Sequence, residues 1–129
     1  MLRRSAKNMS LSFIDLIKEV KGADRLGVHL SYMRKRPGMY FGCPPFLAPL
    51  HNFLWGYEIA EQCHNVRDKH LPKDDFRNWL IIDKGLKDSA LGWTGMINEI
   101  EPDELKQLHL AIDWFSEFAK INLLDESTL

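Results

Sequence analysis

Histidine and cysteine are the side chains most able to hold a metal ion, and one short stretch of this sequence brings several of them together. Cys63, His64, Asp68 and His70 lie within eight residues of one another, so a zinc site is conceivable there. A structural zinc ion, however, usually has four ligands at a regular spacing, which this stretch lacks. We therefore expect an exposed polar loop over His64–Asp75, with no metal ligand and no cofactor.

The possible nucleophiles are Ser31, Ser89, Ser116 and Cys43, and none of them lies in a recognisable catalytic motif. The serines lack the glycine-flanked turn that presents a nucleophile in hydrolases. A reactive thiol needs a nearby base, and the sequence shows none for Cys43. The run LGWTGM lacks the lysine and the spacing of a phosphate-binding loop. The sequence therefore predicts no catalytic residue and a protein that is not an enzyme.

Acidic residues gather near two predicted connections between helices. The longer stretch, NEIEPDE, covers Asn98–Glu104. One explanation is local, because carboxylates at the start of a helix interact favourably with the helix dipole. The other is an acidic surface that attracts a basic protein partner. The candidate partner-binding residues are Asp83, Asp88, Glu99, Glu101, Asp103 and Glu104.

Length and composition suit one soluble domain with a substantial core, since the chain has 129 residues and 45% of them are hydrophobic. We expect a flexible extension at 1–9, one helical domain at 10–124 and a frayed tail at 125–129. The 17 basic and 18 acidic residues give a net charge of -1. This balance argues against direct nucleic-acid binding, which usually requires a strongly basic surface. No apolar run approaches the ~20 residues of a membrane helix.

The cysteines and the N-terminal residues indicate in which cellular compartment the protein is expected to lie. Cys43 and Cys63 leave a disulfide open, but a domain with this much apolar content needs no such bond, and a reduced setting is the simpler interpretation. The first residues, MLRRSAKNMSLSF, lack the apolar stretch of a signal peptide. Either Met1 or Met9 could begin the chain. We expect a cytoplasmic location.

The spacing of apolar residues predicts an all-α fold: a single compact domain of about five helices, with an ordered loop rich in proline and glycine at 36–46. The run Trp79–Ile82 could form a short strand instead, because short apolar runs are ambiguous by periodicity. The candidate helices cover Ser10–Lys21, Asp24–Arg34, Leu47–Val66, a segment capped by Asp74 or Asp75, Leu91–Ile100, and Pro102 to about Leu123.

Several packing expectations follow from these elements. Gly56 lies in the middle of a predicted helix, where glycine costs stability unless another element approaches closely. Bulky residues at 39–41 predict that the 36–46 loop packs against the core. Four tryptophans are many for so small a core, so we expect one or two at a surface that anchors a protein partner. The expected inward residues are Leu50, Phe53, Leu54, Tyr57, Ala60 and Cys63, then Trp93, Met96, Ile97 and Ile100, then Leu105, Leu108, Ile112, Phe115 and Ala119.

The segment RPGMYFG, at residues 36–42, resembles the RPGMYIG segment of the ATPase domain of gyrase B and related topoisomerases. In that family the segment precedes a helix that supplies the catalytic glutamate and a metal-binding asparagine. Glu58 lies on the helix that follows here, but Gln62 stands one turn later and no DxGxG nucleotide loop follows. A nucleotide-binding or ATPase-like fragment is therefore an alternative function, not the main prediction.

A longer pattern, over about residues 30 to 120, resembles small bacterial immunity-type proteins, some of which are encoded beside polymorphic toxins. The pattern reads RPxMYxG, LxxFLxGYxxA, FxxWL and GWxxxI, followed by a C-terminal helix rich in aromatic residues. The residues expected to fix this fold are Arg36, Pro37, Gly38, Met39, Tyr40, Gly42, Gly56, Tyr57, Trp79, Gly92 and Trp93.

This resemblance implies a protein that neutralises a cognate toxin domain, such as a nuclease of contact-dependent growth inhibition, by covering its active site or substrate-binding surface. The cleft of such a nuclease is basic, so the acidic candidates would speed association. We expect no membrane partner, because the chain has no apolar run of membrane-spanning length. A structural homodimeric subunit is the remaining alternative, and a homo-oligomer is possible in either case.

Overall fold

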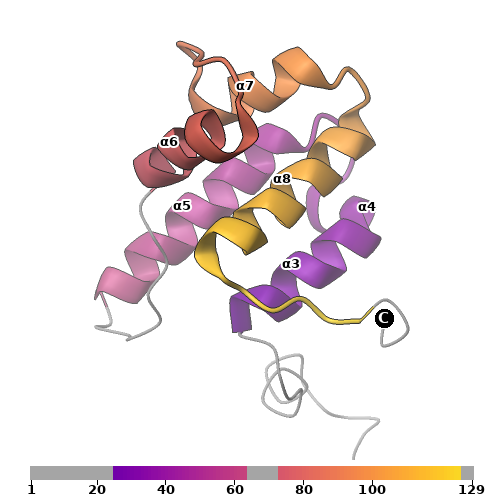
Figure 1. Ribbon diagram of the computed structural model, residues 1–129. Helices are drawn as coiled ribbons and strands as arrows, with labels where there is room; N and C mark the ends of the chain where they lie inside the picture. Colours follow the sequence, from indigo (N-terminus) through magenta and orange to yellow (C-terminus); the bar gives the residue numbers. More distant parts are fainter. Residues whose placement is uncertain (1–24, 64–72, 126–129) are drawn as a thin grey trace, which may run out of the picture.

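The computed structural model describes residues 25–63 and 73–125 and confirms the all-α fold (Figure 1). The predicted helix at Ser10–Lys21, most of the polar loop after Cys63 and the end of the tail lie outside the described residues. Within those residues there is no strand, and no helix is long and apolar enough to cross a membrane. The helices are α3 (Arg25–Lys35), α4 (Pro37–Phe41), α5 (Leu47–Cys63), α6 (Lys73–Lys84), α7 (Gly92–Ile100) and α8 (Glu104–Ala119).

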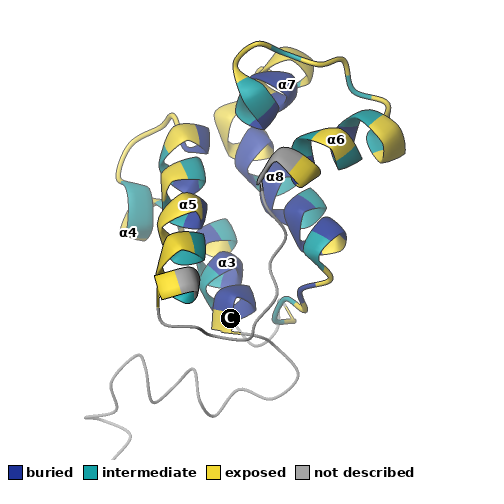
Figure 2. Ribbon diagram, turned by 90° about the vertical axis from the view of Figure 1, so that its left-hand side faces the viewer, coloured by how far each residue is buried: buried dark blue, intermediate teal, exposed yellow. Residues whose placement is uncertain are grey.

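The core is built around α8, which contacts α3, α5, α6 and α7 (Figure 1). Phe76 of α6 is fully buried, and its ring lies 5.3 Å from Trp93 and 5.2 Å from Phe115 between centroids. Both pairs meet edge to face, a geometry that stabilises beyond simple burial. Figure 2 shows the buried inner faces of the helices turned toward one another. The core also includes Leu26, Leu30, Met33, Leu50, Leu54, Leu80, Met96, Ile97, Leu108 and Ile112.

The residues after α8 turn back along α3 (Figure 1). The turn begins at Lys120, whose backbone is left-handed with φ 57°. Ser31 of α3 holds the returning segment, since its hydroxyl oxygen accepts a hydrogen bond from the Leu124 N–H at 2.8 Å. The same hydroxyl donates to the Gly27 carbonyl at 2.7 Å. Residues 121–125 thereby cover one side of α3.

Gly27 makes this close packing possible. A Cβ added at Gly27 would overlap the carbonyl oxygen of Asn122 and lie 3.1 Å from Cγ2 of Ile121. The glycine that weakens the helical pattern of this segment is therefore required by the approach of the chain's own C-terminal segment. Arg34 and Asp113 further tie α3 to α8, through two hydrogen bonds of 2.8 Å.

The prediction of a loop over residues 36–46 is partly wrong, because Pro37–Phe41 form the short helix α4. Pro37 occupies the first position of α4, where the missing N–H costs little. Gly42 ends the helix with φ 75°. Tyr40 and Phe41 pack against the core as expected, but Met39 is 75% exposed. The proline and glycine signals mark the ends of this helix and not a continuous loop.

Several predicted helix boundaries and faces also need correction. The alternative strand at Trp79–Ile82 is wrong, because α6 continues through it to Lys84. Asp74 and Asp75 lie inside α6 and not at its cap. The last helix ends before residue 120, short of the predicted end. The residues expected to point inward but found exposed are Ala60, Cys63, Ile100 and Leu105.

Candidate functional site

The connection between α7 and α8, together with the helix ends beside it, carries four of the six acidic candidates, and two of them shape the connection. The N–H of Glu101 donates to the Ile97 carbonyl at 3.1 Å and closes the end of α7. Its carboxylate accepts a hydrogen bond from the Asp103 N–H at 3.0 Å. The Asp103 carboxylate in turn accepts one from the Lys106 N–H at 2.9 Å, which caps the start of α8. The local explanation is therefore correct for Glu101 and Asp103.

Gln107, which the sequence analysis did not single out, fixes this connection to the core. Its side chain is 3% exposed, and Nε2 donates to the Asn98 side-chain oxygen at 2.7 Å and to the Glu101 carbonyl at 2.6 Å. A buried amide that donates hydrogen bonds to both sides of a turn stabilises one conformation of that turn. No sequence pattern identifies such a residue, because a glutamine on a helix is ordinarily exposed.

Glu99 and Glu104 flank this rigid turn, and both are exposed. Ile100 and Leu105 lie beside them and are 47% and 43% exposed. We call these four residues the acidic corner. Apolar side chains surrounded by a charged rim are typical of protein interfaces, where the apolar groups supply affinity and the charges orient the partner.

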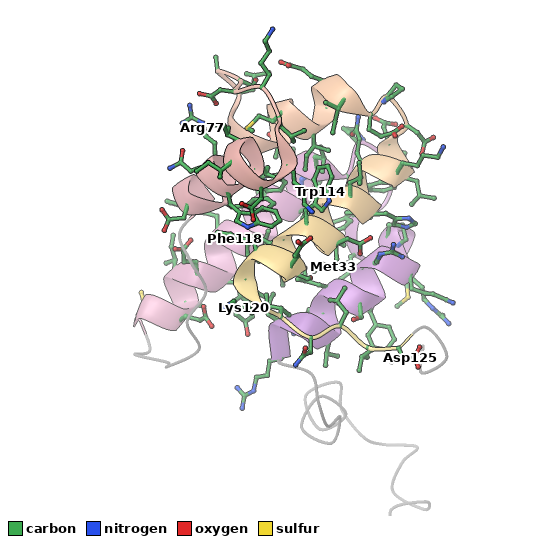
Figure 3. All side chains as sticks on the ribbon, in the orientation of Figure 1. Met33, Arg77, Trp114, Phe118, Lys120 and Asp125 are labelled. Atoms are coloured by element: carbon green, nitrogen blue, oxygen red, sulfur yellow. The ribbon has the colours of Figure 1, made fainter. Side chains whose placement is uncertain are left out.

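The two other acidic candidates precede α7 in the chain, whereas the acidic corner is formed by the end of α7 and the start of α8. Asp83 is exposed near the end of α6. Asp88 forms two hydrogen bonds to Arg77, one of them 2.7 Å from Nε, and Arg77 projects from the outer side of α6 (Figure 3). The hydrogen bond from Arg77 holds the pKa of Asp88 below its usual range.

A surface pocket of about 250 Å³ lies at the start of α7. Its polar groups already have structural roles. Arg77 pairs with Asp88, the ring of His51 lies 5.8 Å from that of Trp93, and the Ser89 hydroxyl accepts the Leu91 N–H at 3.1 Å. No three metal-ligating side chains come together anywhere in the described part of the chain. The lining residues are His51, Arg77, Ser89, Ala90, Leu91, Gly92, Trp93 and Thr94.

The remaining nucleophile candidates are two buried serines, Ser31 and Ser116, and the exposed Cys43. Ser31 is 2% exposed and bonds only to backbone groups. The Ser116 hydroxyl is buried without a hydrogen-bond partner among the described residues. Cys43 and Cys63 are both exposed and are not joined in a disulfide.

The four tryptophans divide by their exposure. Trp93 is 4% exposed and belongs to the core. Trp79 and Trp114 are partly buried, and the Lys84 ammonium lies over both rings, at 5.3 and 5.7 Å. Only Trp55 leaves about half of its surface open, at 51%. The expectation of a tryptophan at the surface is confirmed, while its role in binding stays a prediction.

Trp55 belongs to an outward side of α5 that carries no charge. Every exposed residue among the described side chains of α5 is apolar, small or an amide. Glu58 and Glu61 are only partly exposed and flank this side. Figure 2 shows it as the exposed edge of α5, facing away from the core. We call it the α5 outer face, and it consists of Ala48, Asn52, Trp55, Gly56, Ile59, Ala60 and Cys63.

The residues of the longer sequence pattern have mixed roles. Those with a clear structural role are Pro37 and Gly42 at the ends of α4, Tyr40, Tyr57, Trp79 and Trp93 in or against the core, and Gly92 with φ 79°. Arg36, Gly38, Met39 and Gly56 are exposed. The search against protein-family models, curated proteins and solved structures found no match. The resemblance to immunity-type proteins therefore stays a prediction.

Proposed function

We propose that this chain is an immunity-type protein that acts in the bacterial cytoplasm by binding a cognate toxin domain. The acidic corner is the observation that supports this proposal most. Glu99 and Glu104 present negative charge on either side of a turn that Gln107 holds in place. Ile100 and Leu105, the residues that follow them in the chain, add exposed apolar surface. A preformed surface of this kind loses little entropy when it binds.

In this proposal the toxin is a nuclease whose basic cleft receives the acidic corner. The carboxylates of Glu99 and Glu104 stand where nucleic-acid phosphates would otherwise bind, so the protein excludes the substrate. Complementary charge accelerates the encounter and makes it sensitive to salt. Ile100 and Leu105 then bury apolar surface against the cleft wall, which slows dissociation. No covalent step is needed, and protection requires one chain for each toxin domain.

Co-expression in bacteria with the toxin encoded by the neighbouring gene tests this function. The wild-type chain is expected to restore growth, and the double variant Glu99→Lys/Glu104→Lys is expected to lose protection. Asp83→Lys is the matched control, because it reverses an exposed carboxylate outside the acidic corner. Failure of the wild-type chain to protect would refute the function. Equal loss in the control would refute the acidic corner as the site.

A further inference from the structure

The segment that follows α8 docks on a side of α3 that is shaped to receive it (Figure 1). A Cβ added at Gly27 would overlap the Asn122 carbonyl oxygen, so a side chain at this position would displace the segment. Four residues later, on the same side of a helix, the Ser31 hydroxyl accepts the Leu124 N–H at 2.8 Å. Two positions of α3 are therefore adapted to residues 122–125, which we call the C-terminal strap.

The C-terminal strap is held weakly in spite of this fit. Within the part of the chain that the structure describes, the hydrogen bond from Leu124 to Ser31 is the one that fastens the strap. Asn122 and Asp125 are exposed, and Leu123 is only partly buried against the core. One hydrogen bond and one partly buried leucine contribute little more free energy than the ordering of four residues costs. Closure of the strap should therefore be reversible.

Ile121 marks the place where firm packing ends. Its side chain is 6% exposed and belongs to the core, and its N–H donates to the Ser116 carbonyl at 2.9 Å. The residue before it, Lys120, has the left-handed backbone that turns the chain away from α8. Ile121 is thus anchored by both its side chain and its backbone, whereas the C-terminal strap beyond it is not.

We propose that the C-terminal strap opens from α3 and closes again while Ile121 and the helices stay in place. In the closed form the Asn122 carbonyl lies over Gly27 and the Leu124 N–H binds Ser31. In the open form both contacts are lost, and the backbone after Ile121 takes up the change in direction. The chain then has two folded states that differ at its C-terminal end.

This device goes beyond the proposed toxin binding and does not depend on it. The acidic corner includes the start of α8, and the C-terminal strap follows its end. The 16 residues of α8 separate the two by about 24 Å along the helix. Substitutions that open the strap should therefore leave protection against the toxin unchanged, and reversal of charge in the acidic corner should leave the strap closed.

Hydrogen exchange of the full chain, followed residue by residue by NMR, tests the opening. The Leu124 amide should be protected about 10–100-fold, and the Phe115 amide in the middle of α8 at least about a hundred times more strongly. Low concentrations of urea should speed exchange at Phe115 but hardly at Leu124, because local opening exposes little surface. Equal protection of both amides, or no protection of Leu124, would overturn the proposal.

Ile112→Val separates opening of the strap from unfolding of the whole chain. Ile112 is 1% exposed, and the loss of its methyl group should raise the unfolding constant about fivefold. Exchange at Phe115 should accelerate by the same factor, whereas exchange at Leu124 should not change. Equal acceleration at the two amides would mean that the strap leaves α3 only when the chain unfolds.

Gly27→Ala should hold the strap open, because the added methyl group takes the place of the Asn122 carbonyl. Protection of the Leu124 amide should fall at least about tenfold, while circular dichroism shows that the helices remain. Gly38→Ala is the matched control, since it adds the same methyl group to α4 where no atom lies within 4 Å. Unchanged protection of Leu124 in Gly27→Ala, or an equal loss in Gly38→Ala, would overturn the proposal.

Discussion

Two helical glycines, Gly27 on α3 and Gly56 on α5, differ in what lies beside them. Asn122 and Ile121 of the returning C-terminal segment press against Gly27, whereas no described atom lies within 4 Å of a Cβ built at Gly56. Both positions weaken an isolated helix, since glycine has a low helix propensity. The first is explained by a close contact within the chain. No described residue explains the second.

Gly27→Ala should produce the largest effect, because its Cβ would overlap the Asn122 carbonyl and the C-terminal segment would have to move. Overpacking of this kind costs about 1–3 kcal/mol, which exceeds the gain in helix propensity. Urea denaturation followed by circular dichroism measures the free energy of unfolding. A variant as stable as the wild-type chain would mean that residues 121–125 do not pack on α3.

Ser31→Ala tests the same contact without adding an atom. The substitution leaves the Leu124 N–H without its hydrogen-bond acceptor and should lower the free energy of unfolding by about 1 kcal/mol. Hydrogen exchange at the Leu124 amide gives a local readout, because losing the acceptor should speed exchange there. Unchanged exchange would show that Ser31 does not hold the segment.

Gly56→Ala should change stability in the opposite direction from Gly27→Ala. With no described atom within 4 Å, the added methyl group meets no clash in that part of the chain. The free energy of unfolding should rise by about 0.5–1 kcal/mol. A decrease would mean that another part of the protein packs against Gly56, and the contrast between the two glycines would fail.

The contact between α3 and α5 should have the smallest effect on stability. We expect this effect to appear as a dependence of the free energy of unfolding on pH. The ring of His29 lies 5.9 Å from that of Phe53, and burial lowers the pKa of His29. The unfolded chain therefore binds the proton more readily, so the free energy of unfolding should decrease as the pH falls below about 6.5. An NMR titration of the imidazole tests the shift, and His29→Gln should remove this part of the pH dependence. A His29 pKa at or above the usual value would contradict the contact.

The sequence predicts the helices better than it predicts their faces. Strong periodicity and the Asp103 cap locate α8, and apolar spacing locates α5. The predicted inward side of α5 is partly wrong because exposed positions of this helix, such as Trp55 and Ile59, are also apolar, so Ala60 and Cys63 could not be distinguished from core positions. The α4 helix was missed because Pro37 can begin a helix as well as interrupt one.

The candidate site was predictable only in part. Local rules identify Asp103 as a cap, since a carboxylate before a helix accepts N–H groups of its first turn. No local rule predicts that Asp88 pairs with Arg77, eleven residues away. Nor does a local rule predict that Gln107 is buried against the connection between α7 and α8. These contacts depend on how α6, α7 and α8 pack against one another.

Isothermal titration calorimetry of the purified chain with the toxin domain encoded by the neighbouring gene is the most direct test of the proposed toxin binding. We expect saturable binding of one toxin domain per chain, because each chain presents one acidic corner. Binding should weaken with added salt and weaken further in Glu99→Lys/Glu104→Lys. Absence of binding, or equal affinity of the double variant, would contradict the claim that this protein acts by stoichiometric binding through its acidic corner.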